Sequence, residues 1–572
     1  MDHLIKPYQG KLTNCLLEEA SAEALKLESE QFQAITLSQR QQCDLEMLMN
    51  GALSPLSGFM TREVYDCVLE SSRLPNGVLW PIPYYLDISE VQAEELVIGS
   101  RLALRDAEGF MPAVLTVESI WVADKQKEAQ AIYGTQDPTH PGVDYLFNSV
   151  NNVYVGGTIE GLQLPFSYDF ETLRHTPEDL RLKFVKLGWS NIIAFHTSKP
   201  MHRVHYEITM RAAKKANAHI LIHPVIGMSK PGDLQYYARV HCYQAILKHY
   251  PQSLVTLSLS PMAMRMAGPK EALMNTIIRQ NYGCTHYIVG TEHAAPPNVR
   301  DNAGRFYATG SAQSYVQQFT DELEIQVIAM EELCFDEKKN RYIERKPENN
   351  PHCSRLSFSN KKIIDAIAKD EDIPDWVSFP DVLAVLKKVC PPRSKKGFTL
   401  FFTGLSGSGK STLARIIYAK FIEEGQRPVT LLDGDVVRLN LSSELGFSRK
   451  DRLINVSRIA YVASEITKNQ GIAICAPIAP YTVMRREARN KIEQYGAFIE
   501  IHVATSLEEC EKRDRKGLYA KARKGIIPEF TGISDPYETP QLPELRINTE
   551  NLSPIQAAQE IYLYLVREGY IT

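Results

Sequence analysis

A glycine-rich segment in the last third of the chain constrains the fold more than any other feature. Residues 404–411 read Gly-Leu-Ser-Gly-Ser-Gly-Lys-Ser and fit the pattern G-x-x-x-x-G-K-[ST]. They follow an apolar stretch typical of a buried strand (398–403) and precede a helical pattern (411–424). Glycines let backbone N–H groups wrap around phosphate oxygens, and the helix N-terminus adds positive potential. This order predicts a P-loop nucleotide-binding domain rather than a Gly/Ser turn that fits the pattern by coincidence.

Two residues of the loop have specific expected roles. The Lys410 ammonium is expected to contact the β- and γ-phosphates of ATP and to be catalytic. The Ser411 hydroxyl is expected to ligate the Mg²⁺ ion that accompanies ATP. The full set of predicted ATP contacts is Gly404, Gly407, Ser408, Gly409, Lys410, Ser411 and Thr412.

The chain needs several hydrophobic cores, because 572 residues exceed what one core supports. Residues 1–165 mix short apolar segments with frequent Gly and Pro, which favours a β-rich first domain. In residues 166–330 short apolar strands alternate with helical stretches, which predicts a parallel α/β sheet. Residues 331–396 contain a small charged subdomain and a Pro- and Lys-containing linker. With the P-loop domain at 397–572, the expected fold class is a multidomain α/β protein.

The expected strands are short apolar segments. In the first domain they are residues 78–88, 100–106 and 111–117. In the second domain they are residues 191–196, 219–227, 253–259 and 286–290. Besides the strand before the P-loop, the third domain is expected to contain strands at 428–435, 471–478 and 497–503.

The composition excludes several classes of protein. The 64 Lys and Arg residues against 68 Asp and Glu give a net charge of −4, so no basic excess indicates a nucleic-acid partner. No apolar run approaches the ~20 residues of a membrane span, and the N-terminus MDHLIKPYQG lacks the apolar core of an export signal. Ten scattered cysteines without a C-x-x-C pair favour free thiols over a structural zinc site. We therefore expect a cytoplasmic protein that binds neither nucleic acid nor membrane.

Charged residues after the P-loop indicate an anionic acceptor. Asp433 and Asp435 come at the end of an apolar strand, where open α/β sheets place ligand contacts. A carboxylate there is suited to activate an acceptor hydroxyl or to hold Mg²⁺. Arginines and lysines recur in residues 438–455 and 513–519, which suits an acceptor that is itself an anion. Aromatic rings among these segments are suited to stack on a base, but each residue alone is equally compatible with a surface or core position.

Together these segments resemble adenylyl-sulfate (APS) kinase over essentially all of residues 397–572. The shared motifs are GLSGSGKST, DGD with an arginine three residues on, LGFS..DR..N, KGLY and FTGI.DPYE. The resemblance implies Mg²⁺-ATP-dependent phosphorylation of the 3′-hydroxyl of APS to give PAPS, with Asp435 as the catalytic base. By motif position it implies that the APS contacts are Asp435, Arg438, Phe447, Arg452, Asn455, Ile478, Ala479, Lys516 and Phe530.

The chain departs from the kinase pattern at two positions. Val436 stands where the family usually has Asn, and Ala479 where it usually has Ser. The second departure resembles the regulatory C-terminal domain of fungal sulfurylases, which binds PAPS as a sensor and has a damaged P-loop. Because the P-loop and the two aspartates are intact here, the sequence favours a working kinase.

A histidine pair at a strand-to-helix junction indicates a second site. His202 and His205 lie three residues apart, after the expected strand at 191–196 and at the start of a helical pattern. Imidazole N–H groups at such a junction suit the phosphates of a nucleotide in a nucleotidyltransferase. The alternatives are simple helix capping and a zinc site, which lacks a third ligand at motif spacing.

This region resembles ATP sulfurylase (sulfate adenylyltransferase) over about residues 30–390. The resemblance rests on LSQRQQCDLEMLMNGALSPLSGFM, PMHRVH, IHPVIGMSKPGD, MRMAGPKEA and HYIVG. It implies a PUA-like N-terminal domain, a Rossmann-like nucleotidyltransferase domain, and the reaction of ATP with sulfate to give APS and pyrophosphate. It implies catalytic roles for Thr197, His202 and His205. The implied nucleotide and sulfate contacts are His196, Thr197, Ser198, Lys199, Gly290, Thr291, Glu292, His293 and Ala294.

Two arginines of the sulfurylase family are absent. Ser198 and Thr291 stand at their positions, while His196 and Lys199 replace a Gln and an Asn. Each lost arginine removes charge-assisted hydrogen bonds worth ~1.5–3 kcal/mol to the sulfate dianion, so impaired sulfate activation is expected. The alternative is that Lys199, Arg203 or Arg265 supplies the missing charge.

The sequence leaves three hypotheses open. The chain is a bifunctional sulfate-activating enzyme, an APS kinase carrying an inactive sulfurylase-like scaffold, or a sulfurylase with a PAPS-sensing kinase-like domain. The expected small-molecule partners are ATP, APS and sulfate, with Mg²⁺ as the cofactor. The resemblance also implies a homo-oligomer, either a dimer or a hexamer.

Overall fold

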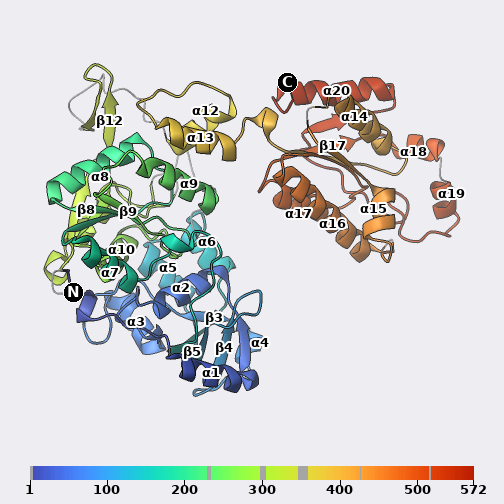
Figure 1. Cartoon of the computed structure of the whole chain (residues 1–572). Helices are drawn as coiled ribbons and strands as arrows, with labels where there is room; N and C mark the ends of the chain where they lie inside the picture. The colour runs from blue at the N-terminus through green and yellow to red at the C-terminus, as the bar shows by residue number, and fades with distance from the viewer. Residues whose placement is uncertain are drawn as a thin grey trace. The chain divides into compact units, whose positions relative to one another are not determined.

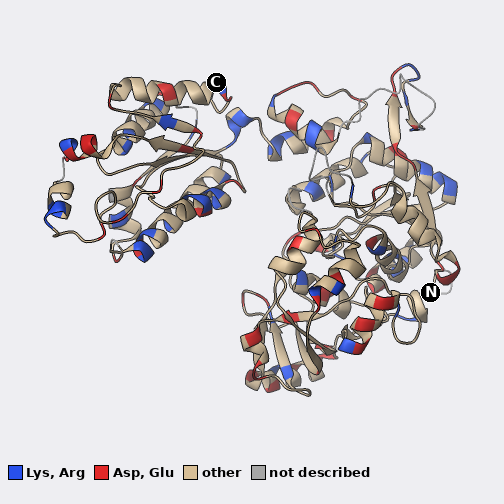
Figure 2. Cartoon of the chain, turned by 180° about the vertical axis from the view of Figure 1, so that it is seen from behind, with Lys and Arg blue, Asp and Glu red and all other residues tan. Residues whose placement is uncertain are grey.

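A computed structural model of the chain describes residues 4–228, 234–296, 305–345, 359–425, 427–446, 448–514 and 517–571. These residues divide into two compact units (Figure 1). The first unit comprises Met1–Ile363 and Ile373–Leu386, and the second comprises Ile364–Asp372 and Lys387–Thr572. Basic and acidic residues are interspersed along the ribbon of both units, in keeping with the small net charge (Figure 2).

The first unit begins with a β-rich domain, as the sequence predicts. Its sheet has the order β1-β4-β5-β6-β2, and β3 also pairs with β6. The strands are β1 (Gln33–Thr36), β2 (Gly58–Phe59), β3 (Leu86–Ile88), β4 (Arg101–Arg105), β5 (Ala113–Val122) and β6 (Val153–Gly161). The expected strand at 78–88 is wrong except at its end, because Pro81 and Pro83 have no N–H to donate to a ladder.

Six helices of the first domain surround this sheet. They are α1 (Glu19–Glu28), α2 (Gln39–Met49), α3 (Arg62–Ser71), α4 (Glu90–Ala93), α5 (Lys125–Tyr133) and α6 (Pro141–Asn148). Helix α2 begins at a capping box, in which the Ser38 hydroxyl accepts from the Gln41 N–H and the Gln41 side chain accepts from the Ser38 N–H. This cap fixes the first turn of α2, which carries Arg40.

The second domain is the predicted parallel α/β sheet, with the order β11-β10-β7-β8-β9. The strands are β7 (Ile192–Phe195), β8 (His219–Ile222), β9 (Val255–Leu257), β10 (His286–Gly290) and β11 (Gln326–Met330). The helices are α7 (Pro177–Leu187), α8 (Arg203–Ala216), α9 (Tyr236–Leu247), α10 (Pro269–Asn281) and α11 (Ser311–Gln317). The hairpin β12 (Leu333–Asp336)–β13 (Arg341–Glu344) and the helices α12 (Asn360–Ala368) and α13 (Pro380–Val389) follow. Because the strands are parallel, the segments after β7 and β10 emerge at the same edge.

The second unit contains a parallel sheet with the order β15-β16-β14-β17-β18. The strands are β14 (Phe398–Thr403), β15 (Val429–Asp433), β16 (Ile472–Ala476), β17 (Ala497–Val503) and β18 (Leu545–Ile547). The helices are α14 (Lys410–Glu424), α15 (Gly434–Leu441), α16 (Arg449–Lys468), α17 (Thr482–Ile492), α18 (Leu507–Arg513), α19 (Leu518–Arg523) and α20 (Pro554–Arg567). Helices α14 and α20 lie on one side of this sheet, and α16 and α17 lie on the other (Figure 1). Phe398, Leu400 and Phe402 cluster with residues of α14 and α20, whereas Phe401 clusters with residues of α16 and α17. Both faces of β14 are therefore buried.

Most of the described cysteines are free thiols: Cys15, Cys43, Cys67, Cys242, Cys284, Cys390, Cys475 and Cys510. Cys334 in β12 is disulfide-bonded, so the expectation of free thiols is wrong at this residue. Within the described ranges, no helix combines the length and the apolar character that a membrane crossing requires.

Candidate active sites

The P-loop joins the end of β14 to the start of α14, as its sequence predicts. Gly404, Gly407 and Gly409 have φ values of 149°, 76° and 105°, which a residue with a side chain rarely adopts. A Cβ at Gly404 would lie 2.6 Å from the Val503 carbonyl oxygen. The glycines are therefore required both for the backbone conformation of the loop and for its close approach to β17.

Lys410 is buried within this loop. Its ammonium donates hydrogen bonds to the carbonyl oxygens of Gly404, at 2.9 Å, and Leu405, at 2.7 Å. The cation thus lies against the backbone that is expected to surround the nucleotide phosphates. Of the other predicted contacts, Ser408 is buried, Ser411 is half-buried in the first turn of α14, and Thr412 is exposed.

Hydroxyl groups from outside the loop fix its shape. The Ser408 carbonyl accepts from Thr505 Oγ1 and from Thr549 Oγ1, both at 3.0 Å. The Tyr519 hydroxyl donates to the Ser406 carbonyl at 2.8 Å. Segments 97 to 141 residues downstream therefore hold the P-loop in place.

The donor set near the P-loop fits Mg²⁺. Asp433 is buried at the end of β15 and lies 3.6 Å from the Arg415 guanidinium. Ser411 lies at the start of α14, which packs against β15. Hydroxyl and carboxylate oxygens are hard ligands of the kind that Mg²⁺ prefers, so these residues are suited to hold the ion that accompanies ATP.

The predicted acceptor residue Arg452 joins two segments that the sequence analysis considered separately. It lies on α16, and its guanidinium donates to the Thr531 hydroxyl, to the Glu529 carbonyl and, at 2.8 Å, to Asp535 Oδ2. Arg438 donates to the Gly446 carbonyl at 3.0 Å. Asn455 is buried on α16, one turn beyond Arg452. The structure therefore brings Arg452 together with the segment that contains Phe530.

Asp535 and Tyr481 are site residues to which the sequence analysis gave no role. The Tyr481 hydroxyl donates to both carboxylate oxygens of Asp535, at 2.7 and 2.8 Å. Since Asp535 also accepts from Arg452, the pair fixes the direction of that guanidinium. Asp535 occurs in the motif FTGI.DPYE, but its contact with Tyr481 spans 54 residues and no sequence spacing reveals it.

The remaining acceptor predictions have mixed outcomes. Phe530 is buried in a cluster with Cys510, Tyr519 and Ala522, so the structure shows it as a core aromatic and its stacking on a base stays a prediction. The Ile478 and Ala479 carbonyls accept from Thr403 Oγ1, at 2.8 and 3.2 Å, which places that turn beside the end of β14. The backbone of Asp435 lies in the first turn of α15. Outside the described part lie Phe447, Lys516 and the Asp435 side chain.

In the first unit, His202 and His205 meet at the start of α8. His205 Nδ1 accepts from the His202 backbone N–H at 3.0 Å, which caps the helix. The ring nitrogens of His202 hydrogen-bond to the Ser378 hydroxyl and to Asn360 Oδ1, both at 2.8 Å. Burial lowers the pKa of His202 to about 4 and that of His205 to about 3. Both imidazoles are therefore neutral at pH 7 and offer N–H dipoles rather than positive charge to a phosphate.

These two lowered pKa values predict acid sensitivity of the first unit. Between pH 6.5 and 4 these two histidines are protonated in the unfolded chain but not in the folded one, so their contribution to the free energy of unfolding falls as the pH falls. The expected loss is about 1.4 kcal/mol per pH unit for each histidine. Tryptophan fluorescence measures it, because all four tryptophans lie before residue 387. His202→Gln is expected to reduce the slope, and the control His241→Gln at an exposed position is expected to leave it unchanged.

The expected sulfate-side residues come together at the edge of the second sheet. His196, after β7, and His293, after β10, have ring centroids 5.7 Å apart. The Thr197 hydroxyl accepts from the Lys199 N–H at 3.0 Å and stabilises the turn between them. Ser198 is buried, and Lys199 is exposed.

The second of these segments, residues 290–294, is held by backbone contacts. Gly290 ends β10, and the Thr291 carbonyl accepts from the Gly310 N–H at 2.9 Å. Glu292 pairs with Arg305 at 3.0 Å, and Ala294 has a φ of 54°. The arrangement is suited to a nucleotide site built from two strand-to-helix connections. Among the described residues, no three His, Cys, Asp or Glu side chains are placed to hold a metal.

Two buried arginines that the sequence analysis did not consider lie behind this site. Arg279 on α10 is fully buried, and its Nη2 lies 2.5 Å from His196 Nδ1. Because a guanidinium can only donate, His196 Nδ1 must accept and the ring proton belongs on Nε2. Arg239 on α9 donates to the Ser198 carbonyl at 2.8 Å. Both arginines lie within ordinary helical patterns of the sequence, so the sequence does not indicate that their side chains are buried.

Two of the three cations considered as substitutes for the missing arginines are engaged elsewhere. Arg265 is buried and pairs with Asp44 at 2.5 Å. Arg203 stacks on the Phe379 ring at 4.2 Å and faces the Ser378 carbonyl. The side chain of Lys199 is exposed and lies beside the site, so it is the remaining candidate of the three.

These two sites define the chain as a nucleotide-dependent transferase that combines a nucleotidyltransferase domain with a P-loop kinase domain. Sequence models of three families match it: PUA-like domain over residues 5–164, ATP-sulfurylase over 171–389 and adenylylsulphate kinase over 396–548. The chain belongs to the sulfate adenylyltransferase (ATP sulfurylase) family and carries a C-terminal adenylylsulphate kinase domain. The family resemblance and the fold class predicted from sequence are therefore confirmed.

Relatives match along the whole chain. The sulfate adenylyltransferases of Phaeosphaeria nodorum and Coccidioides immitis are 43% and 44% identical to it, and each match covers 99% of both sequences. The solved structure of the hexameric APS kinase from Thiobacillus denitrificans superposes with a TM-score of 0.80 at 38% identity, covering 100% of both chains. Both kinds of match therefore span all three matched domains of this chain.

Proposed function

We propose that the C-terminal domain transfers the γ-phosphoryl group of Mg²⁺-ATP to the 3′-hydroxyl of APS and so forms PAPS. The observation that carries the proposal is the complete P-loop, in which Lys410 is already held against the loop backbone. Ser411 and Asp433 would hold the Mg²⁺ ion that accompanies ATP, and the ion would supply positive charge beside the transferred phosphate. Asp435 accepts the proton of the acceptor hydroxyl, and Arg438, Arg452, Asn455 and Lys516 bind the acceptor anion.

The direct test is an assay of the full chain with ATP, Mg²⁺ and APS, scored for PAPS and ADP. Equal amounts of both products are the expected result. Tight PAPS binding without turnover would instead support a sensor domain, which Ala479 resembles. The intact Asp433 and Lys410 favour the kinase over that alternative.

We propose further that the sulfurylase-like domain retains a nucleotide site but activates sulfate poorly. Ser198 and Thr291 stand at the positions of the family arginines, and Arg203 and Arg265 are engaged with other groups. The competing function is full bifunctional sulfate activation, which the identity of 43–44% to sulfate adenylyltransferases over the whole chain favours. Pyrophosphate release from ATP and sulfate separates the two.

The proposal includes a cytoplasmic homo-oligomer. A relative of the same length and domain order is described as hexameric. A dimer remains the alternative, and light scattering of the purified full chain decides between them.

Arg452 gives a prediction specific to the acceptor. Arg452→Ala is expected to raise the KM for APS about 10-fold or more, because a charge-assisted contact worth ~1.5–3 kcal/mol is lost. The KM for ATP is expected to change much less. Steady-state kinetics with each substrate varied in turn measures both effects, and Arg458→Ala, on the exposed side of the same helix, is the control. Equal rises for APS and ATP would show that Arg452 stabilises the whole domain rather than the acceptor site.

A further inference from the structure

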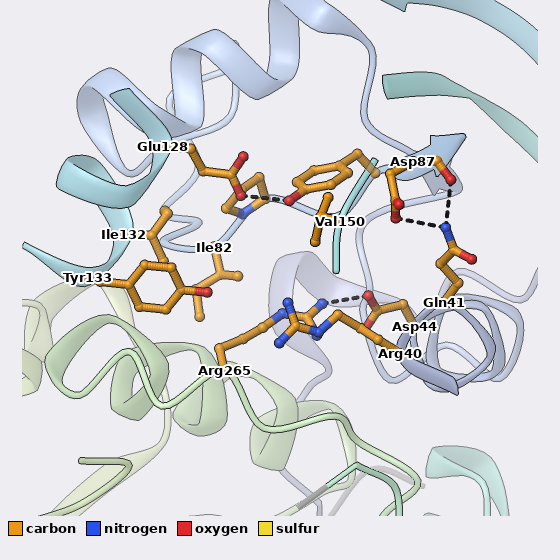
Figure 3. Close-up of a pocket in the computed structure, with 12 residues that line it drawn as sticks. Arg40, Gln41, Asp44, Ile82, Asp87, Glu128, Ile132, Tyr133, Val150 and Arg265 are labelled. Atoms are coloured by element: carbon orange, nitrogen blue, oxygen red, sulfur yellow. Dashed lines mark hydrogen bonds and ion pairs between the residues drawn. The ribbon is translucent and has the colours of Figure 1, made fainter. Parts of the chain in front are cut away.

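A small polar cavity lies inside the first unit and is lined by residues other than those of the candidate nucleotide site described there. Its volume is about 20 Å³, which is room for one water-sized or slightly larger atom. It lies between α2, α5 and the loop at 261–268 that precedes α10 (Figure 3). The residues that line it are Arg40, Gln41, Asp44, Ile82, Pro83, Tyr85, Asp87, Glu128, Ile132, Tyr133, Val150 and Arg265.

Two arginines extend into this cavity from opposite sides (Figure 3). Arg40 is 9% exposed and Arg265 is 7% exposed. Arg265 donates through Nη2 to Asp44, and the face of the Arg40 guanidinium stacks on the Tyr145 ring at 3.7 Å. Within the described part of the chain, Arg40 Nε, Arg40 Nη2 and Arg265 Nη1 are buried without a hydrogen-bond partner. Because a buried charged donor without a partner destabilises a fold, we expect a ligand that accepts hydrogen bonds from these nitrogens.

The acceptors around the cavity are already engaged. The Glu128 carboxylate accepts from the hydroxyls of Tyr65, Tyr85 and Tyr154, at 2.8, 2.7 and 2.9 Å. Asp44 accepts from Arg265, and Asp87 accepts from Gln41 and Asn151 at the half-exposed rim. In the described ranges, no oxygen that lines the cavity is buried without a partner. Among the described residues, each carboxylate that lines the cavity thus already accepts at least one hydrogen bond, whereas three donor nitrogens there donate none.

Charge alone does not select the ligand. Arg40 and Arg265 together balance Asp44 and Glu128, and Asp87 adds one negative charge at the rim. The unpaired hydrogen-bonding groups do indicate the kind of ligand. Three donor nitrogens without acceptors suit a ligand that only accepts hydrogen bonds. A water molecule would direct its own two hydrogens at oxygens that are already engaged. A halide ion matches the room of about 20 Å³ more closely than a tetrahedral sulfate or phosphate does.

We propose that this cavity binds one halide-sized monovalent anion, chloride under cellular conditions, between Arg40 and Arg265. The anion accepts hydrogen bonds from Arg40 Nε, Arg40 Nη2 and Arg265 Nη1. It thereby joins α2 of the β-rich domain to the loop that carries Arg265. The ligand class follows from geometry and hydrogen bonding, and the proposal does not depend on either proposed enzymatic activity.

A bound anion is expected to affect the nucleotide site, because the loop that carries Arg265 also contacts that site. The Arg265 N–H donates to Glu271 Oε1 at 3.2 Å, which ties this loop to α10. The Gly268 N–H donates to the Ala294 carbonyl at 3.1 Å, and the Met264 N–H donates to the Met228 carbonyl at 2.8 Å. One loop thus connects the anion cavity with the segment after β10 that contributes His293. Bound chloride is expected to stabilise this loop together with the first unit.

The test uses the full chain and thermal unfolding followed by tryptophan fluorescence, which reports the first unit. Sodium gluconate is replaced by sodium chloride at constant ionic strength, because gluconate is too large for the cavity. A saturable rise in Tm of roughly 2 °C or more is expected for chloride, and a similar rise for bromide. Arg40→Met is expected to abolish the rise, and the control Arg62→Met, at a mostly exposed arginine of α3, to preserve it.

A second measurement needs no variant and covers the case in which Arg40→Met does not fold. Crystals of the wild-type chain grown in bromide are expected to show an anomalous peak between Arg40 and Arg265. Unfolding that is identical in chloride, bromide and gluconate, together with ordinary water density at this place, would overturn the proposal in favour of a structural water. A chloride effect that persists in Arg40→Met would likewise overturn it, because the anion would then bind elsewhere.

Discussion

Lys410→Ala is expected to abolish PAPS formation from APS and ATP while the second unit stays folded. The Lys410 ammonium lies within 3 Å of two carbonyl oxygens of its own loop, at the place where the phosphates are expected to bind. Its loss removes the cation that neutralises charge on the transferred phosphoryl group, and losses of one such preorganised contact typically reduce kcat by about 10²–10³-fold. The measurement is PAPS production at saturating ATP and APS.

A matched control lies on the same helix. Lys420 is on α14 and stacks over the Tyr562 ring at 3.3 Å, near the exposed end of the helix. Lys420→Ala removes the same charge from the same element, so its turnover is expected to stay within a few-fold of wild type. Circular dichroism and Tm of both variants establish that each is folded. Undiminished turnover in folded Lys410→Ala would contradict the assignment of this loop as the ATP site.

Much of the fold could be predicted from sequence where local pattern and tertiary structure agree. Residues 398–424 have an apolar run, three glycines and a helical pattern, and each local preference favours the same strand–loop–helix unit. The parallel order of the second sheet follows for the same reason, because alternating strands and helices leave few other arrangements. The prediction of a strand at 78–88 is wrong because it rested on the hydrophobic pattern and did not consider Pro81 and Pro83.

The contacts that orient the site residues could not be predicted, because they join residues far apart in the chain. Arg452 reaches Asp535 across 83 positions, and Arg279 reaches His196 across the same number. Arginine on a helix is usually a surface residue, and sequence alone gives no signal that Arg239 and Arg279 are almost fully buried. The motifs indicate which residues belong to each site. Only the structure shows which partner holds each side chain in its orientation.

The second large effect concerns the first unit: pyrophosphate release from ATP and sulfate is expected to be far slower than PAPS formation from APS. The reason is that Ser198 and Thr291 stand where the family resemblance implies arginines. At ~1.5–3 kcal/mol for each charge-assisted contact, the combined loss corresponds to about 10²–10⁴-fold in kcat/KM for sulfate. Coupled pyrophosphate detection with the full chain measures the rate, and brisk release by the wild type would contradict this prediction outright.

Restoring the arginines tests the cause. Ser198→Arg with Thr291→Arg is expected to increase sulfate-dependent pyrophosphate release, and the matched control is Ser198→Gln with Thr291→Gln, which adds bulk without charge. Ser198 is buried, so a new side chain there must share space with His196, which Arg279 holds in place. A further variant therefore also carries His196→Gln and Lys199→Asn, which restores the neighbouring family residues. If this fourfold variant binds ATP but still releases no pyrophosphate with sulfate, the absent arginines do not explain the defect. If it gains activity that the glutamine control lacks, the charge of the two arginines is the missing element.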